Sequence, residues 1–279
     1  MCINYIVAGD TTGPYAMCPT SGHKVICTLV DYVTAATHCV SGESKTSTLY
    51  VKGLKGWRRK FPKYPMGNFY PDGCLEGGSA RELLVQLGDM GAGIIKARVY
   101  VKNRGMIEAS QGILQRAASA LMPQVFKSGE SKFEIPQNLG ILAVLHASEC
   151  RNIALQRTIR IGGETLTGTP LELQGLHSAS RPLDRQPAFG QPVCGLVGNV
   201  AALATATKVT AERKPRGLFI GIDENNQYVL LHFPKNENPR VGSQAKIDTT
   251  RATTSTAVAF APLAEACLEG PEADAPTTE

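Results

Sequence analysis

The sequence predicts an α+β protein in which short strands outnumber helices. Charged residues make up only 19% of the 279 residues, while Gly and Pro number 28 and 17, a mix that favours turns and short strands. Several runs alternate apolar and polar residues, as strands do, and Met106–Leu121 repeats apolar residues with the period of a helix. Both kinds of element are therefore expected in one chain.

The first predicted elements surround a basic segment. Val25–His38 is rich in β-branched residues and is predicted to be a long strand, followed by a short strand at Thr48–Val51. Lys52–Phe61 is predicted to be a helix, because Leu54, Trp57 and Phe61 share one face and Pro62 ends it. Further elements are expected as follows: helices at Arg81–Leu87 and Met106–Leu121, strands at Ile94–Val101, Leu139–His146 and Ile153–Ile161, and a hairpin at Leu218–Phe233.

The chain is expected to form a single α+β domain over residues 1–262. A stretch rich in Gly, Pro and Ser at about 162–198 indicates an inserted loop or hairpin. Residues 263–279 are acidic and rich in Pro, Ala and Thr, and we expect them to be disordered. Because the N-terminal residues do not resemble a secretory signal and no apolar run reaches about 18 residues, a cytoplasmic protein is expected.

The cysteines do not indicate a metal site. The eight cysteines form no C-x-x-C pair, so reduced thiols are expected and neither a metal ion nor a cofactor is predicted.

The distribution of charge is more informative about function. The last fifteen residues hold five acidic and no basic side chains, and the rest of the chain carries 29 basic against 19 acidic ones. This positive body indicates a polyanionic partner.

The positive charge is concentrated between Ser44 and Pro71, where seven bases and no acid occur. Glycines among them would let the backbone approach a phosphate, and cations would neutralise it. Aromatic residues in the same segment can stack on unpaired bases. The predicted RNA-binding residues are Lys45, Lys52, Gly53, Lys55, Gly56, Arg58, Arg59 and Lys60. The alternative is a solvated helix face with Trp57 and Phe61 in the core.

The order of residues here resembles the opening of the RAMP superfamily of CRISPR-associated proteins. A strand ends in Ala36-Thr37-His38-Cys39-Val40-Ser41-Gly42-Glu43, and a spacer leads to Leu49-Tyr50-Val51-Lys52-Gly53-Leu54-Lys55-Gly56-Trp57-Arg58-Arg59. The similarity covers roughly residues 24–61, with Lys52 in place of the usual proline and residues 1–22 as an extra segment.

This resemblance implies a ferredoxin/RRM-like antiparallel sheet core with an inserted lobe and a long hairpin or loop. It further implies a non-enzymatic backbone subunit of a multisubunit CRISPR effector, acting in antiviral defence. Its partners would be a guide RNA and its target nucleic acid, other effector subunits and neighbouring copies of itself, packed head-to-tail in a helical filament. The 162–198 stretch would be the thumb that kinks the RNA.

Two other functions stay open. Ile26–Cys39 resembles the catalytic-histidine strand of chymotrypsin-like proteases, with His38 as base and Cys194 as nucleophile. Against this, Thr37 is inserted in the motif, and Asn152 stands where an aspartate would orient the base. A capsid or other structural assembly protein is the third possibility, because the composition is rich in turns and strands. We assign no catalytic residue from the sequence.

Overall fold

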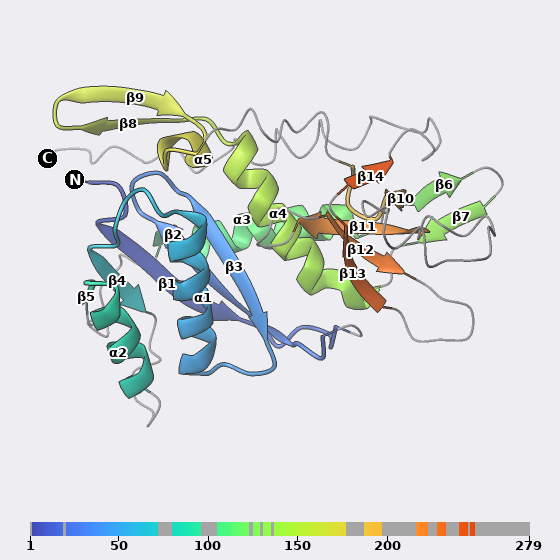
Figure 1. The fold of residues 1–279 in the computed structure, drawn as a ribbon, viewed down its shortest axis with the longest axis horizontal. Helices are drawn as coiled ribbons and strands as arrows, with labels where there is room; N and C mark the ends of the chain where they lie inside the picture. Colours follow the sequence, from blue (N-terminus) through green and yellow to red (C-terminus); the bar gives the residue numbers. More distant parts are fainter. Residues whose placement is uncertain are drawn as a thin grey trace, which may run out of the picture.

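The computed structural model shows two five-stranded sheets with helices against them (Figure 1). It describes residues 2–18, 21–71, 80–95, 105–122, 125–128, 131–134, 137–176, 187–196, 216–222, 228–232, 240–244 and 246–248. Within these ranges, no helix is both long enough and apolar enough to cross a membrane. The tail at 263–279 lies outside them.

The first sheet has the strand order β3-β2-β1-β4-β5. Strands β1 (Ile6–Thr12), β2 (Val25–Asp31) and β3 (Thr37–Gly42) form an antiparallel meander. Strand β4 (Asn68–Pro71) runs parallel to β1, and β5 (Gly93–Ile94) runs parallel to β4. The α+β class is confirmed. The predicted ferredoxin-like antiparallel arrangement is not observed, since the chain crosses over after β3 and returns parallel to β1.

Helices cover both faces of this sheet. One face is covered by α1 (Ser47–Lys60) and α2 (Ala80–Asp89), and the other by α3 (Gly105–Leu121) and α4 (Gly140–Ala154). Strand β2 is buried along its whole length because its alternate side chains enter the two cores. The central strand β1, which belongs to the segment considered extra in the sequence, is therefore a core element of the fold.

The second sheet has the order β13-β12-β11-β10-β14 and is antiparallel throughout. It packs against α4, so that this helix lies between the two sheets. His146 of α4 contacts the rings of Phe189 and Phe219 there. The strands are β10 (Pro192–Leu196), β11 (Arg216–Ile222), β12 (Tyr228–His232), β13 (Arg240–Gln244) and β14 (Lys246–Asp248).

The remaining described elements are short. Strands β8 and β9 form a hairpin that turns at Gly162 and Gly163, both with positive φ. The predicted 162–198 insertion thus begins in a hairpin turn and includes β10, and residues 177–186, 197 and 198 within it lie outside the described ranges. The other elements are β6 (Val125–Ser128), β7 (Ser131–Glu134), the 3-10 turn η3 (Gln137–Leu139), β8 (Arg157–Ile161), β9 (Glu164–Gly168) and α5 (Pro170–Leu173).

Several predicted elements are confirmed and others are wrong. The Met106–Leu121 helix and the hairpin in Leu218–Phe233 agree with α3 and with β11 and β12. The long strand at Val25–His38 is instead a hairpin of two strands that turns at Asp31–Thr34. The strands predicted at Thr48–Val51 and Leu139–His146 lie in helices α1 and α4.

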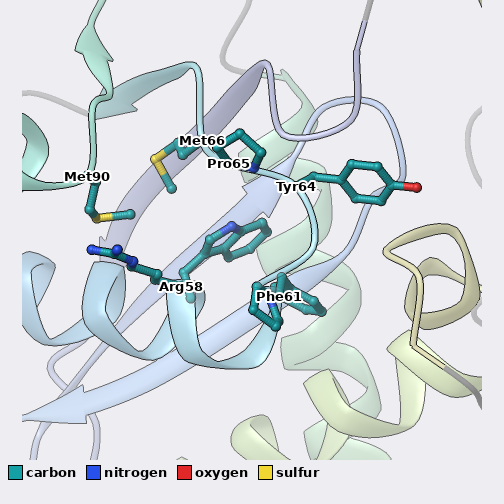
Figure 2. A pocket seen from close by; sticks show the side chains of 8 residues that line it. Arg58, Phe61, Tyr64, Pro65, Met66 and Met90 are labelled. Carbon is teal, nitrogen blue, oxygen red and sulfur yellow. The ribbon is translucent and has the colours of Figure 1, made fainter.

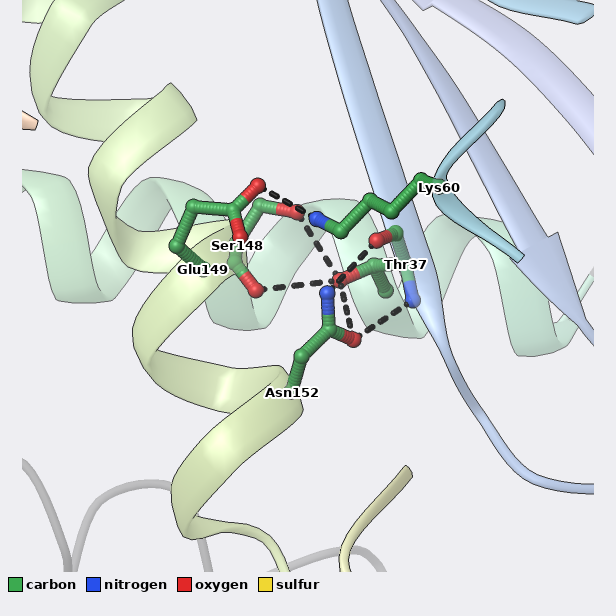
Figure 3. Close-up of polar contacts among 5 residues, drawn as sticks. All are labelled: Thr37, Lys60, Ser148, Glu149 and Asn152. Carbon is green, nitrogen blue, oxygen red and sulfur yellow. Dashed lines mark hydrogen bonds and ion pairs between the residues drawn. The ribbon is translucent and has the colours of Figure 1, made fainter. Parts of the chain in front are cut away.

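Asn152 joins α4 to the edge of the first sheet (Figure 3). Its Oδ1 accepts a hydrogen bond from the Thr37 backbone N–H at 2.8 Å, and its Nδ2 donates to the Thr37 carbonyl at 2.7 Å. Thr37 Oγ1 also lies 2.9 Å from Ser148 Oγ. Because β3 is an edge strand, this side chain takes the place of a neighbouring strand and satisfies backbone groups that burial would leave unpaired.

We expect Asn152→Ala to lower the free energy of unfolding by about 2 kcal/mol, since it leaves a buried N–H and a buried carbonyl without partners. Urea unfolding followed by circular dichroism measures this. Asn68→Ala is the matched control, because the one hydrogen bond that the Asn68 amide makes within the described residues is exposed and 3.4 Å long. Equal losses in the two variants would contradict the role given to Asn152.

Candidate functional site

The predicted basic segment forms the outward face of α1 and the turn before it. Its exposed cations are Lys45, Lys52, Lys55, Arg58 and Arg59. Two of its lysines have partners within the protein. Lys52 Nζ donates to the Ser41 carbonyl at 3.0 Å, and Lys60 forms an ion pair with Glu149 of α4 (Figure 3). The structure therefore brings the predicted cations together on α1, apart from Lys45, which lies just before the helix.

The two predicted glycines lie on the opposite, inner face of α1. A Cβ on Gly53 would meet Leu29 Cδ1 at 3.4 Å, and a Cβ on Gly56 would come within 2.2 Å of His38 Nε2. Both residues are buried against the sheet. They permit the close approach of helix and sheet, and neither backbone is open to a phosphate. The contact predicted for these two residues does not fit their position.

The two residues of the protease hypothesis lie in different sheets, His38 in β3 and Cys194 in β10. Burial of the His38 ring under α1 lowers its pKa to about 3, and the nearby charges of Lys60 and Arg59 act in the same direction. Neither ring nitrogen has a hydrogen-bond partner among the described residues. A base enclosed in this way has no access to a peptide substrate.

A second group of polar side chains lies at the carboxyl end of the central strands. Asp10 is near the end of β1, and the neighbouring parallel strand β4 ends at Pro71, the register partner of Gly9. Asp10 is half-buried and its Oδ1 accepts a hydrogen bond from the Thr11 N–H at 2.6 Å. In open sheets, ligands bind at the carboxyl ends of parallel strands where the chain changes direction, which is the position of Asp10.

The side chain of Asp10 belongs to the face of the sheet that α3 covers. Side chains alternate along a strand, so Asp10 shares its face with Ala8. Ala8 packs against Ile107 in the first turn of α3. Glu108, the next residue of that turn, is exposed. We call Asp10 and Glu108 the carboxylate pair.

The course of α3 places further polar groups along the same strand. Near its middle, Gln115 Nε2 donates to the Tyr15 hydroxyl at 3.3 Å, and this hydroxyl lies 3.0 Å from Thr12 Oγ1. Helix α3 thus follows β1 from Ala8 towards Thr12 and passes Asp10 between them. Gln111, halfway between Ile107 and Gln115 in the helix, is buried, and its Nε2 has no hydrogen-bond partner among the described residues.

Sequence reasoning missed the carboxylate pair. The signals were an aspartate that closes the apolar run from Ile6 to Gly9 and a glutamate in the first turn of a well-predicted helix. Neither is specific by itself, because the pair arises only when α3 is placed on β1. In the described part of the chain, no group of three or more His, Cys, Asp or Glu side chains is placed to hold a metal ion.

Comparisons with known proteins found similarity only among solved structures. No family model and no curated protein matches the chain. The bovine immunodeficiency virus (BIV) integrase catalytic core is 13% identical, with 61% of this chain and 93% of that chain covered and a TM-score of 0.38. The HTLV-2 integrase catalytic core in complex with magnesium is 14% identical, covers 62% and 98%, and has a TM-score of 0.42.

A third similar structure is the simian T-cell lymphotropic virus intasome in complex with the PP2A regulatory subunit B56 gamma. It is 11% identical and covers 88% of this chain and 78% of that chain, with a TM-score of 0.43. All three TM-scores lie below 0.5, so these likenesses carry no argument about the site. No comparison bears on the RAMP resemblance, which stays a prediction.

Proposed function

We propose that the chain binds a divalent cation through the carboxylate pair and uses it to cleave or transfer phosphodiester bonds of a nucleic acid. The observation that carries the proposal is the packing of Ile107 of α3 with Ala8 of β1: Asp10 lies two residues after Ala8 on the same face of β1, and Glu108 follows Ile107 in the first turn of the helix that covers this face. Carboxylate oxygens are the ligands that Mg²⁺ and Mn²⁺ prefer. This proposal departs from the sequence-based expectation of a metal-free, non-catalytic protein.

A third carboxylate is available from the sequence. Asp72 directly follows Pro71, the last residue of β4, and it lies outside the described residues. Because Pro71 pairs in register with Gly9, the residue before Asp10, Asp72 is the natural candidate for a further ligand.

The roles of the residues follow from this arrangement. Asp10 and Glu108 would hold the cation, and a bound divalent cation polarises a phosphoryl oxygen and lowers the pKa of a bound water. The Nε2 of Gln111, which lacks a hydrogen-bond partner among the described residues, is a donor on the α3 face that covers β1. The exposed cations of α1 lie on the other face of the sheet and indicate a polyanionic partner without placing it at the carboxylate pair. The guide RNA, the filament and the capsid alternative stay predictions.

The test uses end-labelled DNA and RNA oligonucleotides with Mg²⁺ or Mn²⁺, and EDTA as the metal-free arm. We expect Asp10→Asn and Glu108→Gln each to reduce cleavage more than about 100-fold, because each removes a charged ligand. Asp72→Asn should do the same. Asp89→Asn is the matched control, since Asp89 is exposed at the end of α2 on the opposite face of the sheet.

Mn²⁺ binding, followed by electron paramagnetic resonance, separates a failure of binding from a failure of catalysis. The unmodified protein should bind Mn²⁺ and Asp10→Asn should bind it at least about tenfold more weakly. Cleavage that persists in EDTA, or that Asp10→Asn and Glu108→Gln leave unchanged, rules out the proposal. So does an unmodified protein that neither binds Mn²⁺ nor cleaves.

A further inference from the structure

A pocket of 180 Å³ lies between the end of α1 and the loop that leads into β4. Its walls include Trp57, Arg58, Phe61, Tyr64, Met66 and Met90. Figure 2 shows the side chains of Arg58 and Met90 close together at one end of the pocket and that of Tyr64 at the other. The loop of the pocket precedes β4, while Asp10 lies near the end of the parallel strand β1. The pocket and the carboxylate pair are therefore at opposite ends of the central strands.

The lining indicates what kind of group the pocket accepts. Aromatic residues, Met and Arg are the types that dominate the centres of protein interfaces. Two methionine side chains adapt to apolar groups of different shape. The volume is close to that of engineered cavities that admit one benzene-sized group, so one bulky apolar side chain fits and a drug-sized ligand does not.

The rim of the pocket carries positive charge. Arg58 is exposed at its edge, and Arg59 and Lys63 are exposed nearby in the chain. No acidic residue occurs from Ser44 to Pro71, so the segment that forms most of the pocket carries no negative charge of its own. The Nε1–H of the buried Trp57 also lacks a hydrogen-bond acceptor among the described residues. A fitting occupant therefore brings an acceptor and negative charge beside its apolar group.

We propose that this pocket is a docking site for an acidic peptide segment of a partner protein, which inserts one leucine- or phenylalanine-sized side chain and places a carboxylate against Arg58. A peptide supplies all three groups within a few residues: the apolar side chain, the flanking carboxylate and backbone carbonyl acceptors. This docking function is separate from the proposed metal-dependent chemistry.

The chain contains a single tryptophan, Trp57, so its fluorescence reports occupancy of the pocket directly. The probes are N-acetylated, C-amidated heptapeptides with one central leucine or phenylalanine flanked by glutamates. We expect a saturable change in emission with these peptides. It should be lost when alanine replaces the central residue or when lysines replace the glutamates.

Arg58→Glu should weaken binding of the acidic peptides at least about tenfold, because it puts like charges together at the rim. Arg81→Glu is the matched control, as Arg81 is exposed on α2 and does not line the pocket. Asp10→Asn should bind the peptides normally, so the two proposals can fail independently. No saturable response to either heptapeptide overturns the proposal. A response to single-stranded DNA or RNA but not to peptides overturns it as well.

Discussion

At pH 5 the protein should be about 4 kcal/mol less stable than at pH 7.5, because two histidines are buried in their neutral form. Burial lowers the pKa of His38 to about 3 and that of His146 to about 4, from an ordinary 6.5. Below pH 6.5 the unfolded chain takes up protons that the folded chain refuses. Each histidine therefore contributes about 2 kcal/mol of the loss between pH 7.5 and 5.

The surroundings of the two rings explain the direction of both pKa shifts. For His38, burial comes first, and the charges of Lys60 and Arg59 add to it. For His146, burial is again the main cause, and Glu149 opposes it. His146 Nε2 lies 3.3 Å from Cys150 Sγ. Among the described residues, no carboxylate forms a hydrogen bond with this ring to stabilise its charged form.

The titration of Asp31 has the opposite effect on folding stability, at lower pH. Burial raises the pKa of its carboxyl group above 3.8, and hydrogen bonds from Thr34 and Asn4 oppose that shift. An acid with a raised pKa in the folded state makes stability rise as pH falls from the folded value towards 3.8. The loss that the histidines cause begins as the pH falls through 6.5 and reaches its full slope about one pH unit lower, where the unfolded histidines are protonated and the folded ones are still neutral.

Urea unfolding at several pH values between 7.5 and 5 measures the expected loss. His38→Leu and His146→Leu should each remove about half of the pH dependence, because each eliminates one buried titrating group. His23→Leu is the matched control, since His23 is only partly buried and its pKa is lowered less than those of the other two. A stability that is flat from pH 7.5 to 5 would show that neither ring is enclosed as described.

How well the sequence predicted each element depended on what the element contacts. Helix α3 has one buried face, so its apolar period is clear in Met106–Leu121. Helix α4 lies between two sheets and buries residues all around its circumference, so Leu139–His146 shows no helical period and resembled a strand. In α1, Leu49, Tyr50 and Val51 are buried in the core, and this packing overrides their preference for strands.

The residues of the candidate site also differed in how well the sequence predicted them. The exposed cations of α1 were predictable, because a run of like charges on one helix face must lie in solvent or against a partner. The carboxylate pair was not, since Asp10 and Glu108 are far apart in the chain and come to the same side of the sheet only through the packing of Ile107 on Ala8. The roles of Gly53 and Gly56 were equally hidden, because a glycine that permits a backbone approach to phosphate looks the same as one that permits helix packing.

Gly56→Ala should lower the free energy of unfolding by about 3 kcal/mol, near the upper end for added volume in a packed core. The new Cβ would lie 2.2 Å from His38 Nε2 and 3.1 Å from Cε1, so either the ring or the helix must move. The ring has little room, because His38 is buried between β3 and α1. The gain of about 1 kcal/mol in helix propensity from Gly to Ala does not offset this clash.

Gly53→Ala, one turn earlier on the same helix face, is the matched control. Its Cβ would make contacts of 3.4 Å or more with Leu29, Cys27 and Val40, so the variant should be as stable as the parent or up to about 1 kcal/mol more stable. The double variant His38→Ala with Gly56→Ala should recover much of the loss, because the truncated side chain leaves space for the methyl group. Thermal and urea unfolding measure all four proteins. If Gly53→Ala and Gly56→Ala behaved alike, α1 would not pack on β3 at Gly56, and the same contact could no longer account for the depressed pKa of His38.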